Sequence, residues 1–222
     1  MKKYLFSFLS LTVLSVGVAY AAPNVFMVGD SNLNSQNQNI EIEHIKSFGL
    51  GVGQPLGDFE AVTEIADYHP GSKMLYSTNG YNSPATVDRY DLSDINNPTL
   101  IESVSVGTGG VTSVAIYEDL LAAAVPSASA TNNGYLKVYN IADDGALTLA
   151  KSLRVGVLPD MVTFSPDGNM ILTANEGQPN DAYTIDPEGS VSIVDISKGV
   201  ESATVTTANF RAFNSNPSSI RK

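Results

Sequence analysis

The chain has 222 residues, of which 23 are acidic and 12 are basic, so its formal net charge is −11, and it contains no cysteine. The absence of thiols excludes disulfide bonds and thiolate metal ligands. The negative charge disfavours nucleic acid as a partner, because phosphate backbones carry the same sign of charge. Only two histidines, His44 and His69, are available for a zinc site or a catalytic triad.

The N-terminus has the three parts of a bacterial secretory signal. A basic pair precedes an apolar run over residues 5–18, and Ala19-Tyr20-Ala21 places small residues at a cleavage site. A membrane anchor is the alternative, but the apolar run is shorter than the ~20 residues that a spanning helix needs. We therefore expect a signal-peptide helix over 1–21, a polar linker over 22–39 and no membrane span in the mature chain. The protein is then exported: periplasmic, secreted or at the cell surface.

Three segments of the chain resemble one another, and each holds four strand-like stretches. The segments are residues 61–107, 110–156 and 159–210. In the first segment the expected strands are residues 62–66, 74–78, 86–92 and 100–106. Matching positions recur about every 50 residues, a spacing typical of repeat architectures. Two sets of positions show this spacing: Ile65, Val114 and Val162, and Asp91, Asn140 and Asp195.

The pattern within each segment predicts a β-propeller blade. Residues 120–125 and 170–174 are almost wholly apolar, as expected for strands buried between neighbouring blades. Residues 136–141 and 191–196 alternate in character, which is typical of half-buried strands. Four strands in each repeat of about 40–50 residues are the signature of a propeller. A β-sandwich is the alternative, but it does not repeat four strands at a time.

We therefore expect an all-β fold: a partial β-propeller of about three four-stranded blades, with YVTN or quinoprotein-like (WD-like) repeats, preceded by the signal-peptide helix. The propeller domain is expected over residues 40–210 and a polar tail over 211–222. Closed propellers have about 4–8 blades, so we expect the domain to be incomplete. The strand-like stretch at 40–48 is expected to be an outer strand of a last blade. The terminal blade should then leave an apolar face unpaired.

Long stretches of the sequence resemble the choice-of-anchor I domain family. They are GGVTSVAI at 109–116, the run LPDMVTFSPDGNMILTANEGQPNDAYTIDPEGSVSIVDIS at 158–197, and ATVTTANFRAFN at 203–214. The family comprises bacterial extracellular propeller proteins with differing C-terminal sorting or anchoring signals. Several members carry an alkaline-phosphatase label, and the family looks distantly like propellers with phytase-like esterase activity. The resemblance thus implies a surface propeller and, as an alternative, a metal-dependent phosphoesterase.

The connection at 175–189 is the first candidate metal site. It is about twice as long as the matching connection at 79–85, and long loops usually have a functional reason. It gathers four carboxylates, with Asn175 and Asn180 as further oxygen donors. Hard oxygen ligands of this kind suit Ca²⁺, although a solvated acidic hairpin is the alternative. The four carboxylates are Glu176, Asp181, Asp186 and Glu188.

A second candidate site lies at the start of the blades. Glu64 and Asp160 precede the first strands of their repeats, and first strands line the central channel of a propeller. Together with Glu176 they are candidates for a ring that holds a divalent ion, which would polarise a phosphoryl group. The alternative is that Glu64 and Asp160 cap backbone amides at the strand starts. His69 lies in a turn and is expected to be structural, while Asp91, Asn140 and Asp195 are expected to bond turn amides.

The function favoured by these features is an exported binding or cell-surface module stabilised by calcium, with no other cofactor and no catalytic residues assigned. Its expected partner is an extracellular protein, a glycan or a phosphoester ligand. The alternative is a divalent-metal-dependent phosphoric ester hydrolase, of an alkaline-phosphatase or phytase type.

Overall fold

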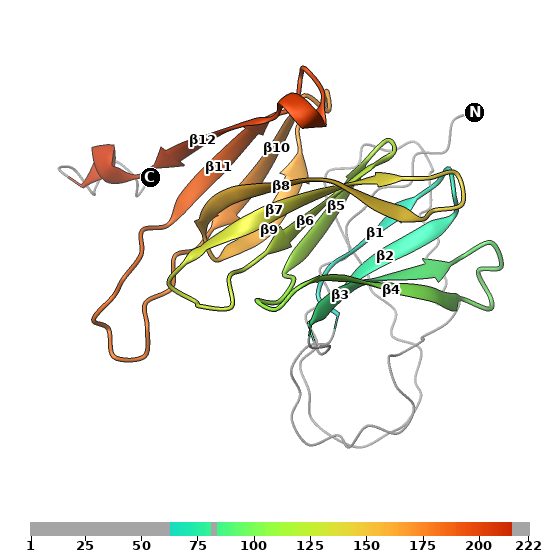
Figure 1. The fold of residues 1–222 in the computed structure, drawn as a ribbon, viewed down its shortest axis with the longest axis horizontal. Coiled ribbons are helices and arrows are strands. Elements are labelled where there is room, and N and C mark those ends of the chain that lie inside the picture. The colour runs from blue at the N-terminus through green and yellow to red at the C-terminus, as the bar shows by residue number, and fades with distance from the viewer. Residues whose placement is uncertain (1–62, 81–83, 215–222) are drawn as a thin grey trace, which may run out of the picture.

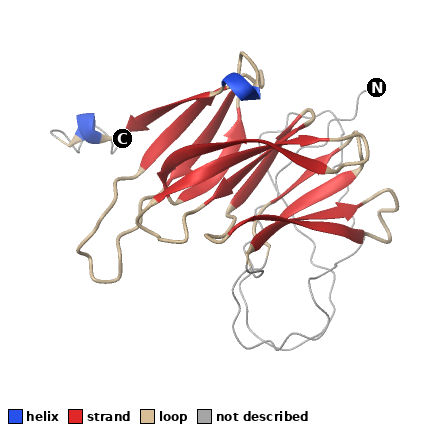
Figure 2. Ribbon diagram, viewed as in Figure 1, coloured by secondary structure: helices blue, strands red, loops and turns tan. Residues whose placement is uncertain are grey.

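A computed structural model describes residues 63–80 and 84–214. The predicted signal peptide, the linker and the strand at 40–48 lie outside these residues, as does most of the polar tail. The described chain forms three separate four-stranded antiparallel sheets and two short 3-10 helices (Figures 1 and 2). The predicted all-β fold with three four-stranded blades is therefore confirmed. Within the described residues, no helix is long and apolar enough to cross a membrane.

In each blade the four strands follow one another in chain order across the sheet. The first blade comprises β1 (Ala66–His69), β2 (Met74–Asn79), β3 (Ala85–Asp91) and β4 (Thr99–Gly107). The second comprises β5 (Ser113–Tyr117), β6 (Leu120–Val125), β7 (Asn133–Ile141) and β8 (Leu147–Val157). The third comprises β9 (Pro159–Phe164), β10 (Met170–Asn175), β11 (Ser190–Asp195) and β12 (Thr204–Asn209). The helices are η1 (Val200–Ser202) and η2 (Arg211–Phe213).

The strand register corrects one predicted alignment and confirms another. Ala66, Val114 and Val162 are equivalent, because they pair with Ser77, Ala123 and Thr173 at matching places in the three second strands. The first repeat is therefore aligned on Ala66 and not on Ile65. The predicted first strand at 62–66 was placed too early, because the chain stays extended as far as His69 and turns only at Pro70, which has no amide hydrogen. The set Asp91, Asn140 and Asp195 is confirmed, since each pairs with the first residue of its second strand.

Asp91 and Asp195 hold the turns that follow them, as predicted, whereas the Asn140 side chain makes no hydrogen bond to a turn amide among the described residues. The carboxylates of Asp91 and Asp195 accept hydrogen bonds from the amides of Ser93 and Ser197. In the turn between β9 and β10, the Asp167 carboxylate accepts from the Ser165 hydroxyl and from Asn169. These hydrogen bonds lower the pKa of Asp167 to about 2. The turn closes through Gly168 at φ +69°, where an added Cβ would lie 2.1 Å from the Tyr117 ring.

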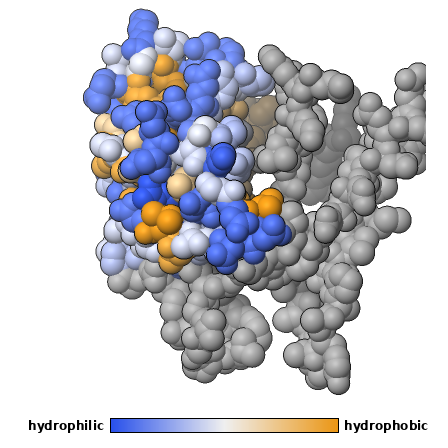
Figure 3. All heavy atoms as spheres, turned by 90° about the vertical axis from the view of Figure 1, so that its right-hand side faces the viewer, coloured by the Kyte–Doolittle hydropathy of each residue, from blue (hydrophilic) through white to orange (hydrophobic). Residues whose placement is uncertain are grey.

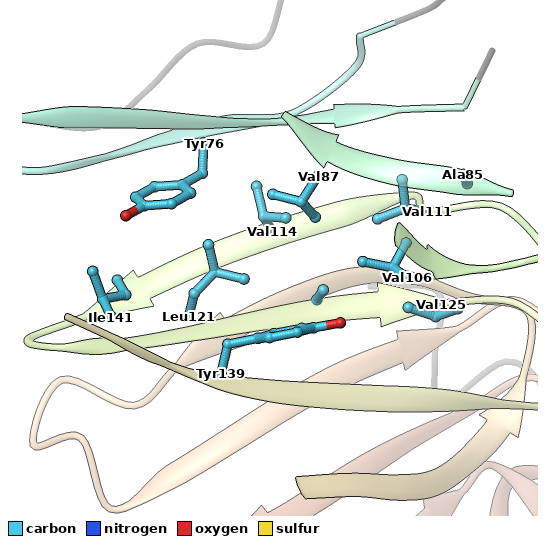
Figure 4. Packing of buried hydrophobic residues seen from close by; sticks show 11 residues of the cluster. Tyr76, Ala85, Val87, Val106, Val111, Val114, Leu121, Val125, Tyr139 and Ile141 are labelled. Carbon is cyan, nitrogen blue, oxygen red and sulfur yellow. The ribbon is translucent and has the colours of Figure 1, made fainter. Parts of the chain in front are cut away.

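The apolar core lies between blades. One cluster joins the first two blades and includes Tyr76, Val87, Leu121 and Val125 (Figure 4). The other joins the second and third blades and includes Ala122, Leu136 and Ile171. Alternate residues of β6 therefore belong to different clusters, which explains why its whole sequence is apolar. By contrast, the surface on the side of the first blade is mainly hydrophilic, with a few separate apolar patches (Figure 3).

Polar side chains tie the inner strands of neighbouring blades together. Asp67 on β1 accepts a hydrogen bond from the Ile116 amide on β5, at 2.8 Å. Ser113 on β5 accepts one from the Val162 amide on β9, at 3.2 Å. Burial raises the pKa of Asp67, while its hydrogen bonds from backbone amides lower it to a lesser extent.

His69 ties the first two blades together at their turns and is buried, which agrees with the structural role predicted for it. Its Nδ1 accepts from the Ser72 amide at 3.2 Å, so the proton of the neutral ring sits on Nε2. Nε2 then donates to the carboxylate of Asp119 in the second blade, at 3.2 Å.

Replacing Tyr76 by Phe should destabilise the protein by about 1–2 kcal/mol, because it removes one buried hydrogen bond and leaves the acceptor without its donor. The Tyr76 hydroxyl donates to the Gly145 carbonyl at 2.6 Å, and both residues are buried. Urea denaturation followed by tyrosine fluorescence measures the effect. The matched control is Tyr183→Phe, whose side chain is exposed. Equal stability of the two variants would contradict the role assigned to the Tyr76 hydroxyl.

Candidate functional site

The longest connection of the described chain, residues 176–189, lies at one end of the blades, which we call the loop face. The loop face consists of the residues that follow β2, β4, β6, β8 and β10 together with the starts of the odd-numbered strands, because antiparallel pairing brings these strand ends together. Its described connections are residues 108–112, 126–132 and 176–189, with Leu158 between β8 and β9. The longest, between β10 and β11, projects from the body of the molecule (Figure 1).

All six acidic residues predicted as metal ligands lie at the loop face. Glu64 precedes β1 and Asp160 lies at the start of β9. The other four, Glu176, Asp181, Asp186 and Glu188, belong to the hairpin between β10 and β11. Within residues 63–80 and 84–214, however, no three acidic or histidine side chains come together as a metal-binding group.

The contacts of these carboxylates differ. Both oxygens of Glu188 accept hydrogen bonds from the Arg211 Nε, at 2.9 and 2.8 Å, so this carboxylate already has a counterion. Glu176 lies 3.5 Å from the Gln178 amide nitrogen, a weak contact. Asp181 and Asp186 are exposed and accept no hydrogen bond from any described residue. They are therefore the hairpin carboxylates most available to a ligand.

The hairpin is organised by Asn180. The Asn180 side-chain oxygen accepts from the amides of Thr184 and Ile185, at 2.9 and 3.1 Å. Its side-chain nitrogen donates to the Thr184 hydroxyl, and its own amide donates to the Ile185 carbonyl. The sequence predicted Asn180 as an oxygen donor to calcium, whereas here its oxygen closes the turn. Asparagine commonly holds turns in this way.

The tip of this hairpin carries two apolar side chains that sequence analysis did not single out. Tyr183 is 79% exposed and Ile185 is 53% exposed. Tyr183 adopts φ +54°, a conformation that costs free energy for a residue with a side chain. The turn therefore holds these two side chains in solvent on an ordered backbone. Their only signal in the sequence was their place in a long connection.

Two blades contain a buried polar centre that sequence analysis also missed. In the first blade, Asn79 and Thr86 donate to the two oxygens of Asp88, which is 0% exposed. In the third, Asn175 donates to Ser190 and Ser192, which occupy the same register positions. We call each set a polar plug, because it fills the space beside its sheet with satisfied hydrogen bonds.

A cleft of about 350 Å³ opens between the first and second blades at the loop face. On one side it is lined by the end of β4 and the following loop, and on the other by β7 and β8 of the second blade. Its polar side chains come from Thr108, Ser127, Tyr135, Lys137 and Ser152. None of the lining residues is acidic, in contrast to the rest of the loop face.

The chain is similar to parts of two solved structures. A functionally unknown protein from Desulfotomaculum acetoxidans is 20% identical over 67% of this chain and 43% of its own, with a TM-score of 0.49. A putative 6-phosphogluconolactonase from Bacteroides fragilis is 15% identical over 65% of this chain and 37% of its own, with a TM-score of 0.50. The chain thus spans about two fifths of the length of these proteins. The second likeness is to a propeller fold and shows the fold alone.

The architecture defines a repeat protein of propeller type. Residues 64–222, most of the chain, match the choice-of-anchor I domain, and the chain belongs to that family. Membership places it among exported or cell-surface proteins. A comparison with proteins of curated function finds no match.

Replacing Asn180 by Ala should release the hairpin, because it removes the hydrogen bonds to two backbone amides at the turn. We expect the Thr184 and Ile185 amides to lose protection from hydrogen exchange by about tenfold or more, which is the loss of roughly one net hydrogen bond. NMR-detected exchange measures this. Asp181→Ala, next in the chain, should leave protection unchanged, and similar exchange in both variants would contradict the role of Asn180.

Proposed function

We propose that the protein is a binding module of a cell-surface propeller, which engages a partner protein through the loop face. The observation that carries the proposal is the exposure of Tyr183 and Ile185 at the tip of an ordered hairpin. Tyrosine is enriched among the residues that dominate binding energy in protein interfaces.

The order of the hairpin favours binding. The Asn180 hydrogen bonds close its tip, and the Glu188–Arg211 ion pair links its base to the segment after β12. A segment that already holds its bound conformation loses less conformational entropy on association. The exposed Asp181 and Asp186 flank the apolar tip, so the complementary partner surface is an apolar depression with a basic rim.

Calcium is a second proposed ligand of the same hairpin. The donors are hard oxygens, which suit Ca²⁺, but this ion takes six to eight of them. Because Glu188 is paired with Arg211, an ion here would rely on Glu176, Asp181 and Asp186 together with backbone carbonyls and water. The phosphoesterase alternative stays a prediction: it needs Glu64, Asp160 and Glu176 around one ion, and no such group of three forms among the described residues.

A photo-reactive amino acid in place of Tyr183 tests the binding proposal in intact cells that export the protein. We expect a discrete cross-linked adduct at this position, weakened when Asp181 and Asp186 are both changed to Lys. The matched control carries the same group in place of Ile95, which is 51% exposed in the turn between β3 and β4, away from the loop face. Equal labelling at both positions, or none at position 183, would refute the proposal.

Titration calorimetry of the EDTA-treated full chain with Ca²⁺ tests the metal. We expect binding heat that is lost when Glu176 and Asp186 are both changed to Ala, because the ion then loses two carboxylate ligands. The control changes Asp143 and Glu201, which are exposed acids outside the loop face, to Ala. If the wild-type chain, shown to be folded by circular dichroism, releases no heat, the calcium proposal fails while the cross-linking result stands independently.

A further inference from the structure

The second blade lacks the polar plug that the other two blades contain. Asn79 and Asn175 both end the second strand of their blades, and the register places Val125 at the same position in β6. The side chain of valine has no hydrogen-bond donor, so it cannot bond to the third strand as the two asparagines do. The third-strand residue that takes part in the plug is Asp88 in the first blade and Ser192 in the third. Both side chains are fully buried. In the second blade this position is Lys137.

Because Lys137 replaces the polar plug, the second blade has a basic side chain in the wall of an open cleft. Lys137 is half-buried in the wall of the cleft, and its ammonium contacts no carboxylate among the described residues. Arg154 on β8 pairs with Tyr135 on β7, so its side chain lies on the same side of the sheet. The chain has about twice as many acidic as basic residues, yet the lining of this cleft contains one basic residue, Lys137, and no acidic one. A cation without a counterion in a partly enclosed site attracts an anion more strongly than one in bulk water.

The other residues that line the cleft indicate what kind of anionic molecule would fit there. Thr108, Ser127 and Ser152 present hydroxyl groups, which both donate and accept hydrogen bonds. Tyr135 adds an aromatic ring that is 41% exposed. The volume of about 350 Å³ lies at the small end of the range for ligand sites, which is about 300–1,000 Å³. Hydroxyls, an aromatic face and a cation together match a small polyhydroxylated acid.

We propose that the cleft between the first and second blades binds an anionic monosaccharide, with Lys137 as the counterion of its acidic group and Tyr135 packed against its ring. The acidic group is a carboxylate, as in a uronic acid, or a phosphate. The hydroxyls of Thr108, Ser127 and Ser152 bind those of the sugar. This site is separate from the hairpin that carries the proposed partner binding, and neither depends on the other.

Titration calorimetry of the full chain with glucuronate, glucose 1-phosphate and glucose tests the proposal. We expect at least one acidic sugar to bind about tenfold or more tightly than glucose, because a charge-assisted hydrogen bond contributes more than a neutral one. The tighter of the two acids identifies the acidic group. The affinity should also fall as salt is raised, since screening weakens the attraction. If neither acid binds more tightly than glucose, the proposal is overturned.

Substitutions then test the residues. Lys137→Met should weaken binding of the acid by about tenfold or more, Lys137→Arg should retain it, and Lys198→Met, at an exposed turn away from the loop face, should change nothing. The double substitution Val125→Asn with Lys137→Ser introduces two of the three polar-plug residues of the third blade and should abolish binding. Unchanged affinity in Lys137→Met, or in the double variant, would overturn the assignment. Retained unfolding temperatures separate loss of the site from loss of the fold.

Discussion

The burial of both faces of the second sheet is the interaction on which the rest of the structure depends. Leu121 and Ala123 of β6 pack towards the first blade, and Ala122 and Ala124 pack towards the third. All four are fully buried. The alanines let neighbouring sheets approach closely, and close packing is what makes dispersion contacts and apolar burial effective. Without this sheet, each of its neighbours would be a single sheet with an uncovered apolar face.

Polar side chains satisfy the backbone amides that remain without acceptors where the blades pack together. Neighbouring inner strands belong to different sheets and do not form a common ladder, so their spare amides need other acceptors. Asp67 and Ser113 supply them across the two blade interfaces. The buried carboxylate of Asp88 is likewise stable because two side chains of its own blade donate to it. The second blade departs from this arrangement, and its departure coincides with the cleft.

The sequence predicted the features that depend on local pattern. The repeat, the wholly apolar strand β6 and the aspartate-held turns at Asp91 and Asp195 follow from residue types at short range. The end of β1 was misplaced, because strand signals extend over several residues and only the pairing with β2 decides where the strand lies. The sequence singled out the six acidic residues, but it did not indicate which of them have partners in the folded chain. The Glu188–Arg211 pair joins residues 23 positions apart, and no local pattern signals such a contact.

The polar plugs and the cleft could not be predicted from the sequence for a different reason. Asn79, Val125 and Asn175 become comparable only once the strand registers are known, because the connections before the third strands differ in length. Similarly, Asn180 was assigned to metal binding from its chemistry alone. The same oxygen can bind an ion or an amide, and the backbone conformation around it decides which.

The spacing of the contacts between blades has a consequence for how the chain folds. Four of the hydrogen bonds that join neighbouring blades connect residues 49 or 50 positions apart: His69–Asp119, Asp67–Ile116, Ser113–Val162 and Lys151–Glu201. Each blade therefore interacts with its immediate neighbours, as in a one-dimensional array. A blade that emerges from the export machinery finds its partner surface on the blade just before it. The chain can thus add its blades in order, and each new blade covers the apolar face that its predecessor exposed.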